Sequence, residues 1–268
     1  MRLDLGYDGA GFAGWARQPG LRTVQGTLEE ALGLLWREPV QLIVAGRTDA
    51  GVHARHQVCH ADIPPDSWEA SAATLVRRLA GLLPGDVRVH AAAAAPTGFD
   101  ARFAALSRTY AYRVRDDPGL ADPLERHAVL AVPQRLDLEA MASASRLLTG
   151  EHDFAAYCRR REGATTVRRL LRLEWERDVA QRAVATVQAD AFCHSMVRAL
   201  VGALLAVGAG RRPPQWPAEV LARGLRDSAV SVAPAHGLVL EHVEYPPDAE
   251  LAQRVRIARQ MRTLPPRF

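Results

Sequence analysis

The nonapeptide GRTDAGVHA, residues 46–54, follows the apolar run Leu42–Val44 and leads into an alternating run that begins at Val52. A Thr-Asp-Ala-Gly sequence between two apolar runs predicts a tight turn between strands, because aspartate and glycine favour turn conformations. Asp49 would stand at one end of a sheet, where an aspartate commonly does no more than accept hydrogen bonds from nearby amides. The unusual feature is Arg47, which lies on the same side as Asp49 in an extended chain.

Outward from this turn, the hydrophobic pattern predicts the same order of elements in each half of the chain. In the first half we expect strands at residues 2–7, 41–45, 52–63 and 87–91, with helices at 23–36 and 67–83. In the second half we expect strands at 108–115, 167–176, 183–189 and 238–244, with helices at 136–148 and 195–207. Two β-α-β-β-α-β units predict an α+β fold of two similar halves, residues 1–104 and 105–268, with sheets joined across a central cleft. The tail from Pro246 onward has a helical pattern and carries arginines.

The composition is that of a folded globular protein, since 48% of the 268 residues are hydrophobic and 24% are charged. The sequence has no apolar run of about eighteen residues, so we expect no membrane-spanning helix. All 34 basic residues are arginine, because the chain contains no lysine, and it contains no asparagine either. The absence of lysine excludes a Schiff-base lysine and the lysine of a P-loop.

The charge balance is a weak indication of a polyanionic partner. The formal net charge is +4 and the pI is near 9.3. Between Arg146 and Arg182 there are nine arginines against six acidic residues, with Arg159, Arg160 and Arg161 in a row. Charge alone does not decide between a nucleic-acid surface and a merely solvated basic face.

The three cysteines are Cys59, Cys158 and Cys193, an odd and scattered set with no paired spacing. Such a set fits a reducing cytoplasm. The opening MRLDLGYDGAGF does not look like a secretory signal, since no apolar core follows a basic start. It predicts the first strand of the fold instead.

The nonapeptide resembles the signature of the tRNA pseudouridine synthase A family. Five further segments resemble that family in the same order along the chain: residues 7–29, 99–114, 150–157, 191–208 and 233–246. The resemblance thus covers nearly the whole sequence. It implies a pseudouridine synthase fold and the conversion of uridine to pseudouridine at tRNA positions 38, 39 and 40, in the anticodon arm. It further implies a homodimer that binds tRNA, with no metal, no cofactor and no membrane.

Within this resemblance Asp49 matches the catalytic aspartate, a nucleophile that attacks either the ribose anomeric carbon or carbon 6 of uracil. The sequence does not decide between the two routes. In either case the freed base turns and bonds to ribose through carbon 5. The target base must first leave the RNA stack, because neither route is open to a stacked nucleotide.

Four other residues match functional positions of the family. Arg198 matches the arginine that pairs with the catalytic carboxylate, and its apolar neighbours favour a charged partner over a plain surface role. Tyr110 matches the ring that stacks on the base and assists removal of the carbon 5 proton, although either Tyr110 or Tyr112 could simply belong to the core. Leu240 matches an apolar wall of the uracil pocket, with core packing as the alternative. Arg47 matches the arginine that enters the RNA helix when the nucleotide turns out.

Three other functions compete with this one. A zinc site would use the donors His53, His56, Cys59 and His60, but alternation along a strand sends the first two to opposite faces. A glycoside hydrolase would normally need two carboxylates, whereas the signature supplies only Asp49. A catalytically silent RNA-binding module would share the basic surface and would have no need of Asp49.

Overall fold

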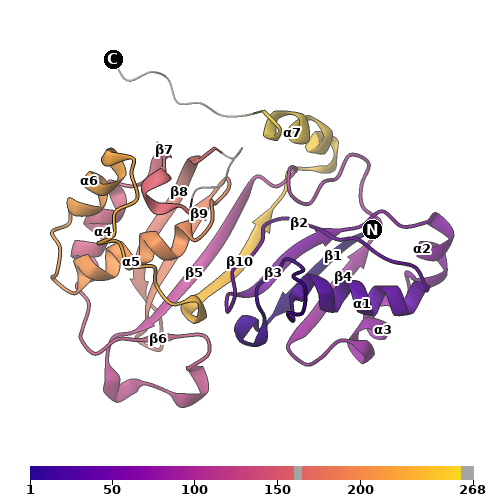
Figure 1. Ribbon diagram of the computed structural model, residues 1–268, viewed down its shortest axis with the longest axis horizontal. Helices are drawn as coiled ribbons and strands as arrows, with labels where there is room; N and C mark the ends of the chain where they lie inside the picture. The colour runs from indigo at the N-terminus through magenta and orange to yellow at the C-terminus, as the bar shows by residue number, and fades with distance from the viewer. Residues whose placement is uncertain (160–164, 261–268) are drawn as a thin grey trace. The chain divides into compact units, whose positions relative to one another are not determined.

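The computed structural model describes residues 1–159 and 165–260 (Figure 1). Contacts within the chain divide it into two compact units. Unit 1 consists of Met1–Arg108 and Leu240–Gln260, and the described part of unit 2 lies within Thr109–Val239. Both boundaries fall inside strands, β5 (Ser107–Arg115) and β10 (Leu238–Glu244). Most of β10 therefore belongs with the N-terminal residues, although it is the last strand of the chain.

The strands of unit 1 follow the order β4-β1-β3-β10, and β1 pairs antiparallel with both β3 and β4. Short β2 pairs with β3. The strands other than β10 are β1 (Arg2–Tyr7), β2 (Ile43–Val44), β3 (His53–His60) and β4 (Val87–Ala93). The strand predicted at residues 2–7 is confirmed, and those predicted at 41–45 and 52–63 are shorter than expected.

In unit 1 helix α3 (Leu75–Leu82) packs against β4, and α1 (Val24–Trp36) contacts α3. The α1 helix begins after Thr23, whose hydroxyl accepts a hydrogen bond from the Gly26 amide at 3.2 Å. The core is fully buried and consists largely of Leu3, Leu5, Val24, Leu28, Leu32, Leu75 and Leu79. The tail adds α7 (Leu251–Ala258), as its helical pattern predicts.

The single helix expected at residues 67–83 is wrong, because the structure has two helices there, α2 (Pro65–Ser71) and α3. The break follows Ser71. Its hydroxyl donates to the Ser67 carbonyl at 2.6 Å and accepts from the Trp36 indole at 3.2 Å. The Thr74 hydroxyl likewise donates to the Ser71 carbonyl at 3.3 Å. Such side chains compete with the backbone for helical carbonyls and favour helix ends, which periodicity does not reveal.

The strands of unit 2 follow the order β5-β9-β8-β7, with the short β6 parallel to β5. They are β6 (Leu130–Ala131), β7 (Gly150–Asp153), β8 (Val167–Arg177) and β9 (Ala183–Ala189). The predicted hairpin of β8 and β9 is confirmed. The pattern did not indicate β6 and β7, which have two and four residues.

Three helices accompany these strands, α4 (Leu138–Arg146), α5 (Met196–Gly208) and α6 (Trp216–Arg223). Figure 1 shows them together in unit 2, and α5 contacts both α4 and α6. Almost every residue of α5 is buried, as expected for a helix that is apolar on all sides. Each unit thus combines β-strands with helices, which confirms the predicted α+β class.

Cys158 and Cys193 form a disulfide, whereas Cys59 is a buried free thiol. The sequence spacing did not indicate this pair. The two partners are 35 residues apart in sequence, but their Cα atoms lie 5.7 Å apart, within the range that a disulfide spans. Folding brings the end of the 3-10 helix η4 (Ala155–Tyr157) beside the segment that precedes α5.

Two further expectations concern the basic run and the absence of a membrane-spanning helix. Arg160 and Arg161 of the basic run lie outside them, as does the tail after Gln260. Within residues 1–159 and 165–260, none of the helices has both the length and the apolar character needed to cross a bilayer.

Candidate active site

The turn that carries Asp49 lies between β2 and β3. The Val52 amide donates to the Asp49 carbonyl at 3.2 Å, and Gly51 has a φ of 76°, a conformation that glycine adopts without strain. Asp49 itself is partly exposed and Arg47 is exposed. The tight turn predicted from Thr-Asp-Ala-Gly is present, and it places the Asp49 carboxylate at the end of strands β2 and β3.

A buried hydrogen-bond cluster fixes the residues on the N-terminal side of this turn. The Tyr7 hydroxyl and the Thr48 hydroxyl are 2.8 Å apart. The Gln57 amide donates to the Gly46 carbonyl at 2.9 Å and to the Tyr7 hydroxyl at 3.3 Å. Arg108, itself buried, donates to the carbonyl of Ala45 at 2.7 Å. Strands β1, β3 and β5 therefore all hold the backbone that leads to Asp49.

Segment 12–15 is hydrogen-bonded to the backbone of the turn. The Trp15 amide donates to the Thr48 carbonyl at 3.0 Å, and the Gly51 amide donates to the Phe12 carbonyl at 3.3 Å. Gly14 has a φ of 101°, and a Cβ atom there would lie 2.9 Å from the Thr48 carbonyl oxygen. Only glycine fits this position without displacing the turn.

Tyr110 and Tyr112 in β5 have distinct surroundings. Tyr110 is 7% exposed, and its ring meets Phe192 edge-to-face with centroids 5.3 Å apart. Tyr112 is fully buried, and its hydroxyl donates to the Pro234 carbonyl at 2.8 Å. Burial raises the pKa of Tyr112, with Arg198 opposing the shift. Of the two rings, Tyr112 therefore has the contacts of a core residue.

Arg198 lies in the first turn of α5, where segment 229–234 passes. Its Nε donates to the Ala233 carbonyl at 2.7 Å, and the Ala233 amide donates to the Arg198 carbonyl at 3.0 Å. This reciprocal pair of hydrogen bonds fixes both the backbone and the base of the guanidinium. One of the five N–H donors of the side chain is used in this way.

The comparisons with known proteins agree with one another. A family model described as tRNA pseudouridine synthase matches residues 144–246. A protein of Frankia casuarinae named tRNA pseudouridine synthase A is 62% identical, covering 99% of this chain and 96% of its own length. A protein of the same name from Streptomyces griseus is 60% identical, covering 99% of this chain and 94% of its own length. Another from Mycobacterium leprae is 51% identical, covering 98% of this chain and 95% of its own length. The chain belongs to the tRNA pseudouridine synthase A family.

The residues that match functional positions of the tRNA pseudouridine synthase A family are distributed over both units. Unit 1 holds Arg47, Asp49 and Leu240, and unit 2 holds Tyr110 and Arg198. Leu240 is fully buried in β10, next to β3 in the strand order. Packing alone accounts for an apolar residue there, so its role as a pocket wall stays a prediction. The roles of the other four residues stay predictions as well.

The sequence pattern does not indicate which residues position the Asp49 turn. Tyr7, Gly14, Trp15 and Gln57 lie far from the signature in sequence or within a neighbouring strand. The available signal is the glycine-rich segment YDGAGFAGW at residues 7–15, which resembles the opening of tRNA pseudouridine synthase A.

The donors of the competing zinc site have separate partners. His53 accepts a hydrogen bond from the Gly9 amide at 3.0 Å, and His60 accepts one from the Ala101 amide at 3.1 Å. The His56 ring stacks on His242, with nitrogen atoms 3.0 Å apart. Cys59 is fully buried, and burial raises the pKa of its thiol. Residues 1–159 and 165–260 contain no group of three or more His, Cys, Asp or Glu side chains placed to hold a metal ion.

Proposed function

We propose that this chain isomerises uridine to pseudouridine at positions 38, 39 and 40 in the anticodon arm of tRNA, with Asp49 as the nucleophile. The near full-length identity to proteins named tRNA pseudouridine synthase A supports the reaction. The observation that carries the role of Asp49 is its turn, which β1, β3 and segment 12–15 hold by buried hydrogen bonds. A nucleophile on such a rigid turn loses little entropy when it attacks.

The chemistry exchanges one bond for another without oxidant or cofactor. The carboxylate of Asp49 bonds to the ribose anomeric carbon or to carbon 6 of uracil, and the bond between ribose and nitrogen 1 breaks. The base rotates, carbon 5 bonds to the anomeric carbon, and the aspartate is released. The carbon 5 proton passes to water and nitrogen 1 gains a proton. The product is an isomer of the substrate.

Each remaining candidate has one proposed task. Arg198 orients the carboxylate by bidentate hydrogen bonding, for which a guanidinium is well shaped. Tyr110 stacks on the everted uracil and assists loss of the carbon 5 proton. Leu240 forms an apolar wall beside the base, and Arg47 fills the position that the nucleotide vacates in the RNA stack.

Replacement of Asp49 tests this proposal. With tRNA tritiated on carbon 5 of uridine, we expect Asp49→Asn to release no label to water while binding tRNA within about twofold of wild type, since only the nucleophile is lost. Asp62→Asn is the matched control, because Asp62 is an exposed aspartate that follows β3 in the same unit. Its turnover should equal that of wild type. Label release by Asp49→Asn at the wild-type rate would exclude Asp49 as the nucleophile.

The rival functions give different products in the same assay. A hydrolase would release free uracil, whereas an isomerase leaves the base on the RNA. A silent RNA-binding module would release no label even as wild type. The comparisons do not support it, because these similar proteins carry the name of an enzyme.

We also propose that the chain acts in the cytoplasm as a homodimer on tRNA, as the family resemblance implies. Ultracentrifugation should then show a species of twice the chain mass of 29.2 kDa. In that compartment the bond between Cys158 and Cys193 would form only transiently, because cytoplasmic disulfides are usually short-lived.

A further inference from the structure

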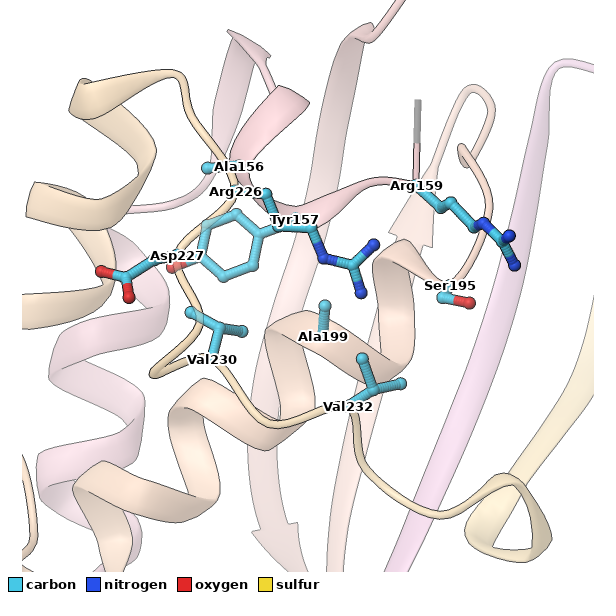
Figure 2. A pocket seen from close by; sticks show the side chains of 9 residues that line it. All are labelled: Ala156, Tyr157, Arg159, Ser195, Ala199, Arg226, Asp227, Val230 and Val232. Carbon is cyan, nitrogen blue, oxygen red and sulfur yellow. The ribbon is translucent and has the colours of Figure 1, made fainter. Parts of the chain in front are cut away.

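Unit 2 contains a small pocket that the proposed chemistry does not use. It lies between η4, the start of α5 and segment 226–232 (Figure 2). Its polar lining consists of Tyr157, Arg159, Ser195, Arg226 and Asp227. Ser195 precedes Arg198 by three residues, so the pocket lies one helical turn from a candidate catalytic residue.

The pocket carries two guanidinium groups on its rim. Arg159 and Arg226 are both exposed, and neither side chain has an ion pair or hydrogen bond among the described residues. Figure 2 shows the Arg226 side chain running past the Tyr157 ring toward Ala199, with Ser195 and Arg159 on the side away from Asp227. Figure 2 shows the Arg159 guanidinium beyond Ser195 and turned away from Arg226, so an anion at the rim would lie between two like charges and lower their repulsion.

The one carboxylate of the pocket is already neutralised. Asp227 receives a hydrogen bond and ion pair from Arg223 at 3.2 Å, and its other oxygen accepts from the Ala229 amide at 2.8 Å. Tyr157 is no acid here, because its hydroxyl donates to the Pro217 carbonyl at 2.7 Å and burial raises its pKa. The net charge of the pocket is therefore positive.

The size of the pocket indicates what kind of anion it accepts. The enclosed space is about 10 Å³, which is room for about one water molecule or one ligand oxygen. A whole nucleotide does not fit, so the anionic group must be carried on a larger molecule that stays at the surface. A phosphodiester has two charged oxygens, and guanidinium groups bind such oxygens in bidentate fashion.

We propose that Arg159, Ser195 and Arg226 bind one backbone phosphate of the tRNA. This inference rests on the proposed function, because it requires that RNA binds. Its consequence is positional: a phosphate held at the start of α5 fixes the RNA backbone one turn from Arg198. Such a contact contributes to affinity and register and carries no sequence information.

The first test measures tRNA affinity against salt concentration, with Asp49→Asn as the background so that turnover does not interfere. Adding Arg226→Gln should weaken binding about tenfold at low salt and lower the slope of log K against log salt by about 1. Arg226→Lys should restore part of the affinity. The control is Arg211→Gln, which removes an exposed arginine beyond the opposite end of α5. If Arg211→Gln and Arg226→Gln behave alike, the pocket is not a phosphate site.

The second test locates the phosphate. In a series of tRNAs with single methylphosphonates, one neutral linkage should weaken binding to the Asp49→Asn background and cause no further loss with Arg226→Gln. Additive losses at every linkage would overturn the proposal. The site would also be reassigned to free phosphate if inorganic phosphate or uridine monophosphate bound through Arg226 while Arg226→Gln left tRNA affinity unchanged. Failure of wild type to bind tRNA at all would instead refute the proposed function.

Discussion

Tyr7 illustrates how a single side chain far from the signature controls it. Its ring is buried in β1, and burial raises the pKa of its hydroxyl to about 12, against the smaller opposing effects of hydrogen bonds with Thr48 and Gln57. The group therefore stays protonated at physiological pH and can serve only as a hydrogen-bonding partner. It joins Thr48, the residue before Asp49, to the sheet.

We expect Tyr7→Phe to lower the free energy of unfolding by about 1–3 kcal/mol, because the buried Thr48 and Gln57 side chains lose a partner. Loosening of the turn should also lower kcat while leaving tRNA affinity nearly unchanged. Tyr245→Phe is the matched control, since its hydroxyl donates to the Ala101 carbonyl at 2.7 Å in the same unit. Urea denaturation and label release measure both properties. Equal kcat values for the two variants would show that Tyr7 does not act through the turn.

At the scale of elements, α5 and segment 229–234 depend on each other. Segment 229–234 holds Arg198 through Ala233, and it comes so close to α5 because residue 202 is glycine. A Cβ atom on Gly202 would overlap the carbonyl oxygen of Ser231 and lie 2.9 Å from its carbonyl carbon. The helix is thus not only a core element but also the support on which the guanidinium is oriented.

Gly202→Ala should therefore destabilise the fold by about 1–3 kcal/mol and lower kcat, because the segment must move away and take Ala233 with it. The control is Gly81→Ala in α3, where an added Cβ atom meets nothing within 4 Å. That change should be neutral or stabilise by about 0.4–1 kcal/mol, since alanine is the better helix former. Thermal unfolding and label release provide the comparison. A Gly202→Ala variant as stable and active as Gly81→Ala would contradict the role of the close approach.

At the scale of the whole molecule, buried charge makes stability depend on pH. Asp116 follows β5, and its carboxylate accepts two hydrogen bonds from Arg177 at 2.7 and 2.8 Å and one from the Leu136 amide at 2.8 Å. Burial raises the pKa of Asp116, but the hydrogen bonds and the charge of Arg177 lower it further, to about 2. An unfolded aspartate has a pKa of about 3.9. The carboxylate thus ties β5, β8 and the start of α4 together only while it is ionised.

Since the folded pKa lies below the unfolded one, the stabilisation is complete above about pH 5 and is lost as the pH falls through about 4 toward 2. We expect Asp116→Asn to lower the unfolding free energy by about 2–3 kcal/mol at pH 7 and by much less near pH 2.5. Urea denaturation of both proteins across this range measures the difference. A difference that stayed constant down to pH 2.5 would assign the effect to lost packing instead of charge.

Local patterns specified much of this protein. The alternation in β1, β9 and β10 and the apolar periodicity of α1 and α5 lie within short windows, so these elements were predicted to within one or two residues. The turn at Asp49 was equally local, because Thr-Asp-Ala-Gly specifies its own backbone. The ordered resemblance along the chain indicates the family from the sequence alone.

Tertiary structure alone decided which distant residues support that turn and helix. Tyr7 contacts Thr48, which is 41 residues away in sequence, and Gly202 contacts Ser231, which is 29 residues away. The disulfide joins Cys158 to Cys193 across 35 residues. No short window contains both partners of such a pair. Tertiary structure also decided that β10 groups with the N-terminal residues, because its neighbour β3 is distant from it in sequence. Sequence determines periodicity and turn chemistry, whereas close packing determines which segments meet.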